Sequence, residues 1–170
     1  MPNWCENELY IKGKKSEVEA FIEAVRGGRE DPTVFDFAKI VPYPEEYDLA
    51  DKARREWEET YKNVPWNQRP PAPQDGFNQG GYQWCCNNWG TKWNACDIRF
   101  YKTSRGCTMG FNTAWSPPTP VIAKASELFP NLYFRLKYWE GGAGFRGEFE
   151  AQGGVILNDW NDNYLGHRGG

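Results

Sequence analysis

The sequence predicts a single α+β domain built on an antiparallel sheet. Three observations lead to this prediction. Several segments alternate apolar and polar residues with the period of a strand, three segments carry apolar residues at helical spacing, and turns rich in Gly and Pro separate them. With 170 residues, the chain has the length of one domain and can bury a core that needs no disulfide or metal.

The N-terminal region supplies the first elements. Residues 3–12 alternate in the pattern of a half-buried strand. A helix follows near Ser16, which forms a capping-box pattern with Glu19 and precedes apolar residues at positions i, i+3, i+4 and i+7. Residues 33–41 are rich in β-forming side chains and stop at Pro42, so a second strand is predicted there.

An insertion is predicted at residues 44–83. Its first part, residues 45–64, carries apolar residues at helical spacing between many charges, which predicts a surface helix with one apolar stripe. Its second part, residues 65–83, is rich in Pro and Gly and has no period. We expect that part to be a loop.

Strand patterns dominate the C-terminal half. One helix is predicted to begin at Pro120, with Thr119 as its N-cap, and to end at Phe129, where Pro130 stops it. The tail, residues 158–170, is polar and expected to be frayed. The predicted strands of this half are residues 93–101, 107–115, 132–139 and 145–151, with a short extra strand at 155–157.

Without its insertion, this order of elements corresponds to the βαββαβ plan of a ferredoxin-like fold. Both core helices then lie on one face of the antiparallel sheet, and the other face is free. The domain is expected to span residues 1–157. The core is predicted to contain Leu9, Ile11, Phe21, Val25, Ile98, Phe100, Ile122, Leu128, Leu132, Phe134 and Leu136.

Composition excludes several classes of protein. The 20 Lys and Arg against 23 Asp and Glu rule out a chain that is basic overall, and the 28 aromatic residues (9 Trp, 9 Tyr and 10 Phe) are too many for a disordered chain. No segment has the roughly 20 apolar residues of a membrane span, and the N-terminus has no apolar signal core. A cytoplasmic protein without a membrane contact is expected.

The residues that usually hold metals or act as nucleophiles are few. The five cysteines, an odd count, fit reduced thiols, and their spacing matches no common zinc site. The single histidine, His167, lies near the C-terminus, so no Ser-His-Asp or Cys-His arrangement is predicted. No metal and no cofactor are expected.

Three motifs carry a family resemblance. They are PNWCEN at residues 2–7, NWGTKWNA at 88–95 and TAWSPP at 113–118, supported by FPNL at 129–132 and the turn at 140–148. Together they resemble the Api92-like, or YubB-type, family of phage and plasmid proteins. The resemblance implies a ferredoxin-like domain, an origin in a bacterial mobile element and no settled activity. The sequence departs from the family pattern at residues 65–83, at Cys85-Cys86 and after Ala151.

Tryptophan and asparagine gather near strand ends. This set forms either a packed corner or a pocket that recognises a protein or another ligand, because indole rings fill volume while their N–H groups need acceptors. The lysine of the set could contact an anion or lie over a ring. The candidate residues are Asn3, Trp4, Asn88, Trp89, Thr91, Lys92, Trp93 and Trp115.

Basic and aromatic residues interleave on the expected free face of the sheet. Single-stranded nucleic acid needs such groups, since rings stack on bases and cations neutralise phosphates. An ordinary solvated sheet face also carries them, and an inserted helix lying over this face would defeat the idea. The residues are Arg99, Tyr101, Tyr133, Arg135, Lys137 and Trp139.

The expected function is therefore that of a non-enzymatic adaptor or inhibitor from a mobile element, which binds a protein of the bacterial host or of a phage. A single-stranded nucleic-acid-binding module is the first alternative. The second is an enzyme that uses a carboxylate pair drawn from Glu6, Glu8, Glu148 and Glu150, because acid–base catalysis needs only two well-placed carboxyl groups.

Overall fold

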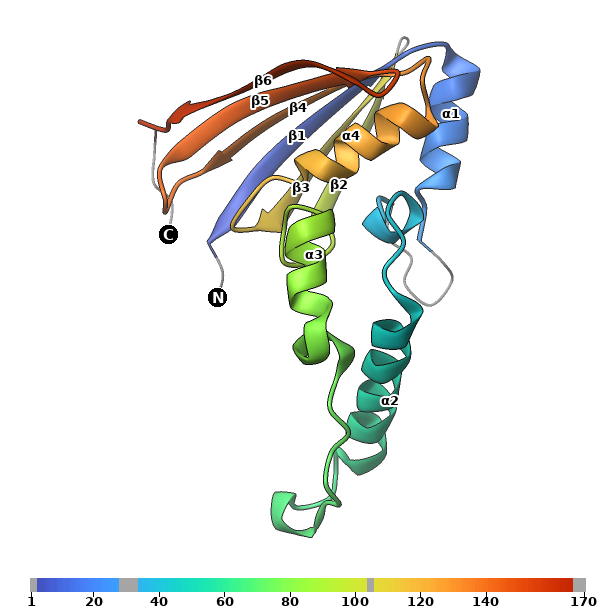
Figure 1. Ribbon diagram of the computed structural model, residues 1–170, viewed down its shortest axis with the longest axis vertical. Coiled ribbons are helices and arrows are strands. Elements are labelled where there is room, and N and C mark those ends of the chain that lie inside the picture. Colours follow the sequence, from blue (N-terminus) through green and yellow to red (C-terminus); the bar gives the residue numbers. More distant parts are fainter. Residues whose placement is uncertain (1–2, 28–33, 104–105, 167–170) are drawn as a thin grey trace.

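Six strands form one sheet in the computed structural model, which describes residues 3–27, 34–103 and 106–166 (Figure 1). The strand order is β2-β3-β1-β4-β5-β6, and each pair of neighbouring strands is antiparallel. The predicted α+β domain with an antiparallel sheet is thereby confirmed. The strands are β1 (Trp4–Lys12), β2 (Cys96–Thr103), β3 (Gly106–Ala114), β4 (Tyr133–Glu140), β5 (Phe145–Gln152) and β6 (Val155–Asn163).

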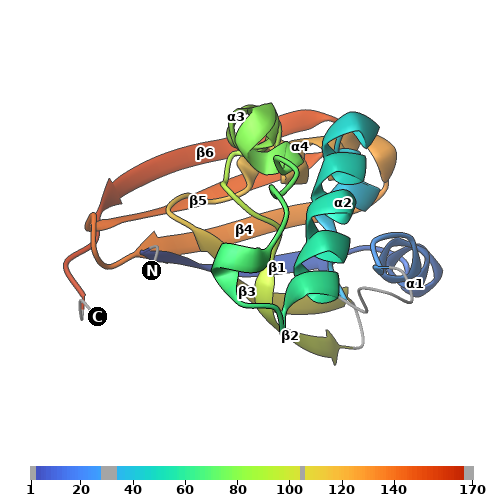
Figure 2. The same cartoon turned by 90° about the horizontal axis from the view of Figure 1, so that it is seen from below.

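The labelled helices all lie to one side of the sheet. Two of them, α1 (Lys15–Ala24) and α4 (Thr119–Leu128), pack close to it. The other two, α2 (Glu45–Tyr61) and α3 (Tyr82–Asn88), extend away from it in an arm that spans residues 44–88 (Figure 1). Seen along the arm, α2, α3 and α4 stand in front of the same face (Figure 2). We call the opposite face the open face.

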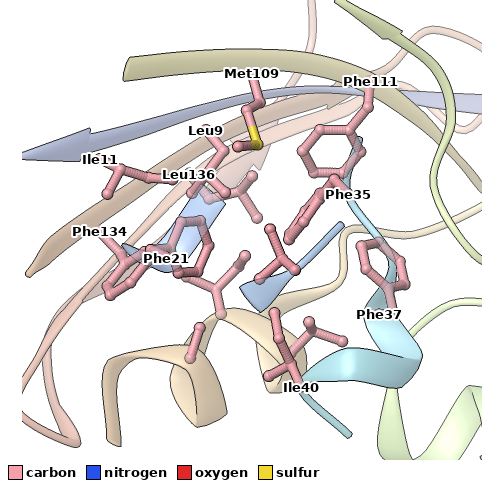
Figure 3. Packing of buried hydrophobic residues seen from close by; sticks show 14 of the residues in the cluster. Leu9, Ile11, Phe21, Phe35, Phe37, Ile40, Met109, Phe111, Phe134 and Leu136 are labelled. Atoms are coloured by element: carbon pink, nitrogen blue, oxygen red, sulfur yellow. The ribbon is translucent and has the colours of Figure 1, made fainter. Parts of the chain in front are cut away.

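The core fills the space between the sheet and α1 and α4 (Figure 3). Alternation along β1 turns Leu9 and Ile11 to the helices, where both are fully buried. Phe21 of α1 meets Phe134 of β4 edge-on, with ring centroids 5.3 Å apart. Two further predicted core residues, Ile98 and Phe100, are partly buried against this cluster.

One predicted core residue is wrong. Leu128 is 50% exposed because α4 ends there, and the helix turns its buried stripe of Val121, Ile122 and Ala125 to the sheet. Apart from Ile98 and Phe100, the remaining predicted core positions are buried.

The strand predicted over residues 33–41 does not form. The described part of this segment is a turn that contains a 3-10 helix, Phe37–Lys39. The side chains of Phe35, Phe37 and Ile40 in this turn are buried. The Asp36 carboxylate caps this turn by accepting a hydrogen bond from the Ala38 N–H at 2.9 Å. Apolar spacing alone does not distinguish this arrangement from a strand. Residue 33 lies outside the described residues.

The prediction of a loop over residues 65–83 holds only in part, since residues 69–75 form neither helix nor strand. The segment contains helical turns at Trp66–Gln68 and Phe77–Gly81, and it leads directly into α3. Asp51 of α2 holds it, since one carboxylate oxygen accepts the Phe77 N–H at 3.0 Å and the other accepts the Tyr43 hydroxyl at 3.3 Å. The predicted surface helix is confirmed, and α2 has no buried residue.

Two boundaries differ from the prediction. α1 begins at Lys15 with Lys14 as its N-cap and no side-chain capping bond, so the Ser16 capping box does not form. The short strand predicted at 155–157 continues to Asn163, because the main chain of this polar segment pairs with β5. Ladder pairing requires no apolar side chain. Residues 167–170 lie outside the described residues.

Candidate functional site

The tryptophan-rich set lies where β1 begins and β3 ends. The Lys92 ammonium sits over two rings, 4.4 Å from the centroid of Trp93 and 4.7 Å from that of Trp115. A third ring, Tyr82 of α3, is 5.9 Å away, and Trp4 lies 6.3 Å from Trp93 between ring centroids. The three distances from the Lys92 ammonium are in the cation–π range, so the rings surround a cation that belongs to the chain itself.

Other members of this set tie the local backbone. Trp89 is only 6% exposed, and its indole N–H donates to the Val41 carbonyl at 2.9 Å. The Thr91 hydroxyl, also buried, donates to the Ala114 carbonyl at 2.9 Å. The Asn88 amide donates to the Trp84 carbonyl. These three residues hold the connection that leads into β2.

The first residue of the set, Asn3, fixes the other side of this corner. Its carbonyl accepts the Trp115 N–H at 3.0 Å, and its side chain packs directly against Gly142. Trp115 has a left-handed backbone with φ 71°, and this residue is 45% exposed. The set therefore has a packed inner part and an exposed outer part.

The six residues predicted for the free sheet face all lie on the open face. Strand register shows this directly, because residues opposite one another on paired strands point to the same side. The arm does not cover them (Figures 1 and 2). One row across the sheet consists of Arg99, Gly110, Glu8, Lys137, Glu148 and Trp160, and the next of Tyr101, Thr108, Tyr10, Arg135, Glu150 and Asn158.

Two of the predicted residues already have carboxylate partners. The Tyr133 hydroxyl donates to Glu150 Oε2 at 2.6 Å, and Arg135 Nε lies 2.9 Å from Glu148 Oε2. Burial, helped by this hydrogen bond, raises the pKa of Tyr133 to about 12. The same bond lowers the pKa of Glu150. The sequence did not show this pairing because it depends on the register between β4 and β5.

Charges on the open face are balanced. A third row joins Asn112, Glu6, Trp139, Arg146 and Asp162, and Lys12 lies opposite Tyr133. The face therefore carries as many cations as anions among its paired strand positions. The cations are Lys12, Arg99, Arg135, Lys137 and Arg146; the anions are Glu6, Glu8, Glu148, Glu150 and Asp162.

Two of the shallow hollows on this face lie on either side of Trp139. The first, of about 420 Å³, lies over β2, β3 and β1 around Gly110. The second, of about 330 Å³, lies over β4, β5 and β6 and is bordered by Trp160 and Tyr164. Sequence reasoning missed Gly110 and Trp160. Their places in the alternation of β3 and β6 could have assigned them to this face.

The cysteines and acidic groups show no metal arrangement in the described ranges. No cluster of three or more His, Cys, Asp or Glu side chains there could hold an ion. All five cysteines are free thiols. Burial raises the pKa of Cys5 and of Cys85 to about 12 and that of Cys107 to about 11, so these three thiols are protonated near neutral pH.

The layered sheet and helices define an α+β domain of the ferredoxin-like class. Residues 88–165 match the family model described as the ferredoxin-like domain in Api92-like protein. This match confirms the resemblance to the Api92-like family that the motifs predict.

A solved structure has a similar fold. It is the crystal structure of a protein api92 from Yersinia pseudotuberculosis, which superposes with a TM-score of 0.61 at 10% identity, over 98% of this chain and 99% of that chain. At this identity the likeness concerns the fold alone. No curated protein matches the sequence. Within the described residues, no helix has both the length and the apolar character to cross a membrane.

Proposed function

We propose that this protein is a non-enzymatic binding protein that acts on another protein through the open face of its sheet. The observation that supports this function is a six-stranded face that no helix of the described residues covers and that presents Tyr101, Trp139 and Trp160 among alternating charges. Exposed aromatic residues and arginine are enriched in protein interfaces. Tyr101 is 60% exposed and Trp160 is 42% exposed.

The biological setting in this proposal is a bacterial cytoplasm. The motif resemblance supports an origin in a phage or plasmid, and a role as adaptor or inhibitor of a host or phage protein. We also infer a βαββαβ plan from β1, α1, β2, β3, α4 and β4. The strand order β2-β3-β1-β4 supports it, with the arm inserted between α1 and β2 and with β5 and β6 as additions.

A protein partner fits this face better than nucleic acid. A surface that tracks a phosphate backbone needs a net positive charge. Here Glu8 lies between Gly110 and Lys137 in its row, and Glu148 and Glu150 engage Arg135 and Tyr133. Glu148 and Glu150 are two of the four carboxylates considered for catalysis, and both are already bonded to these partners. Binding is therefore also favoured over acid–base catalysis.

Affinity capture from phage-infected bacterial lysate tests the proposal. The bait is compared with an open-face variant, Tyr101→Ala/Trp160→Ala, and with a matched arm variant, Leu49→Ala/Trp66→Ala, whose side chains are also exposed. We expect one protein to be retained by the wild type and the arm variant and lost by the open-face variant. Recovery of nuclease-sensitive material in its place, or equal loss with both variants, would overturn the proposal.

A further inference from the structure

We propose that the hollow around Gly110 receives an arginine side chain of the partner protein. This inference rests on the proposed function and names the chemistry of the partner at one point of the open face. The Gly110 hollow is bounded by Glu6, Glu8, Asp97, Arg99, Tyr101 and Trp139.

A missing side chain creates the space. Gly110 lies in the middle of β3, between Arg99 on β2 and Glu8 on β1. A Cβ atom built there would meet only ordinary contacts, 3.9 Å from the Arg99 Cβ and 3.9 Å from the Asn7 carbonyl oxygen. The floor is therefore open backbone, and the hollow of about 420 Å³ is large enough for a guanidinium group and its stem.

The charge of the walls specifies a cation. Three carboxylates, Glu6, Glu8 and Asp97, border the hollow against the one guanidinium of Arg99. In the described part of the chain, Glu6 and Glu8 form no ion pair, whereas Glu148 and Glu150 across the sheet are already hydrogen-bonded. The unpaired negative charge of the open face is thus concentrated on this side of Trp139.

The third carboxylate reaches the hollow through a local irregularity. The register between β2 and β3 shifts between Cys96 and Arg99, and Asp97 in this bulge has φ 52°. The Asn112 amide donates to Asp97 Oδ2 at 3.1 Å, so β3 positions this side chain.

The rings favour arginine over other cations. Trp139 lies opposite Glu6 and borders the hollow, and Tyr101 stands at its other end. A guanidinium group stacks on aromatic faces and pairs with a carboxylate through two parallel hydrogen bonds, while an ammonium group does neither as well. The hollow combines carboxylates and aromatic rings in its walls with a floor that carries no side chain, and this combination fits an arginine side chain.

Fluorescence anisotropy with labelled peptides tests the inference. The probes are Gly-Arg-Gly-Arg-Gly and its lysine and glutamate counterparts, with labelled oligo-dT as a nucleic-acid probe. We expect the arginine peptide to bind most tightly. The double variant Glu6→Gln/Glu8→Gln should weaken it by about 3- to 10-fold, as befits exposed charges. Gly110→Leu, which fills the hollow, should weaken it by about tenfold or more.

The matched control removes two carboxylates elsewhere. Glu46→Gln/Glu56→Gln changes the net charge equally on α2 and should leave the affinity unchanged within twofold. Equal weakening by this control, insensitivity to Gly110→Leu in a variant with native circular dichroism, or tighter binding of the glutamate peptide or oligo-dT would overturn the inference. A captured protein that depends on Trp160 but not on Glu6 and Glu8 overturns this inference alone. Loss of all specific capture overturns the proposed function.

Discussion

At the scale of single residues, the hydrogen bond between Tyr133 and Glu150 is the clearest electrostatic feature of the open face. It stabilises the ionised carboxylate and so lowers the pKa of Glu150 below its ordinary value of 4.5. A carboxyl group whose pKa is lowered in the folded state stabilises the fold at pH values above its ordinary pKa. This contribution is lost as the pH falls through the lowered pKa.

Tyr133→Phe removes the donor and keeps the ring. We expect the pKa of Glu150 to rise toward its ordinary value, as followed by NMR titration of the carboxyl carbon. The variant should unfold at lower urea concentration than the wild type at pH 7. The difference should shrink as the pH falls through the lowered pKa of Glu150, because both proteins then carry a protonated Glu150. An unchanged pKa, or a stability difference that is independent of pH, would contradict this account.

Core packing makes a second prediction at this scale. Phe134 is fully buried against Phe21, so Phe134→Ala should lower the free energy of unfolding by about 3 to 5 kcal/mol. Leu128→Ala, at a half-exposed position, should cost less than about 1 kcal/mol. Urea denaturation of both variants measures the contrast. A loss below about 1 kcal/mol for Phe134→Ala would place that side of β4 outside the core.

At the scale of elements, strands with one buried face were the most predictable. Alternation in β1 and β4 identifies both the strand and its faces, because a shift of one residue would turn all the apolar side chains from the core to the solvent. The short helix α3 escaped prediction because Tyr82–Asn88 has only seven residues and directly follows a segment rich in Pro and Gly. Phe35 and Phe37 were assigned to a strand because their spacing fits one. In the structure a turn buries the same two residues.

The arm depends on a few polar contacts, which gives the prediction at this scale. Asp51 joins α2 to the segment before α3 through the Phe77 N–H, and to the segment before α2 through the Tyr43 hydroxyl. Asp51→Ala should leave both donors without this acceptor and raise amide exchange across residues 77–88. Exchange in β1 and β4 should not change, because neither strand contacts that carboxylate. Uniform acceleration across the sheet would show that the arm and the sheet unfold as one unit.

At the scale of the whole molecule, the sequence predicted the open face but not its charge. Alternation placed Arg99, Arg135 and Trp139 together because it sorts side chains by face. It could not place Glu8 beside Lys137 or Glu148 beside Arg135, since those neighbours follow from strand order and register. The hollow around Gly110 requires three strands in their final positions, so it was beyond prediction for the same reason.

The balance of charge on the open face leads to the last prediction, which concerns single-stranded nucleic acid. With net charge −3 overall and equal numbers of cations and anions at the paired strand positions of this face, the protein should not bind labelled single-stranded DNA or RNA at tens of micromolar and physiological salt. A stacking site would behave differently. Tyr133→Ala would weaken it by about 5- to 150-fold, and three phosphate contacts would give a slope near −2 for log affinity against log salt. An anisotropy titration at low and physiological salt, repeated with Tyr133→Ala and Arg135→Ala, separates the two cases. Binding with that slope and that sensitivity would assign the open face to nucleic acid, whereas its absence leaves a protein as the partner that this mixture of rings and paired charges suits.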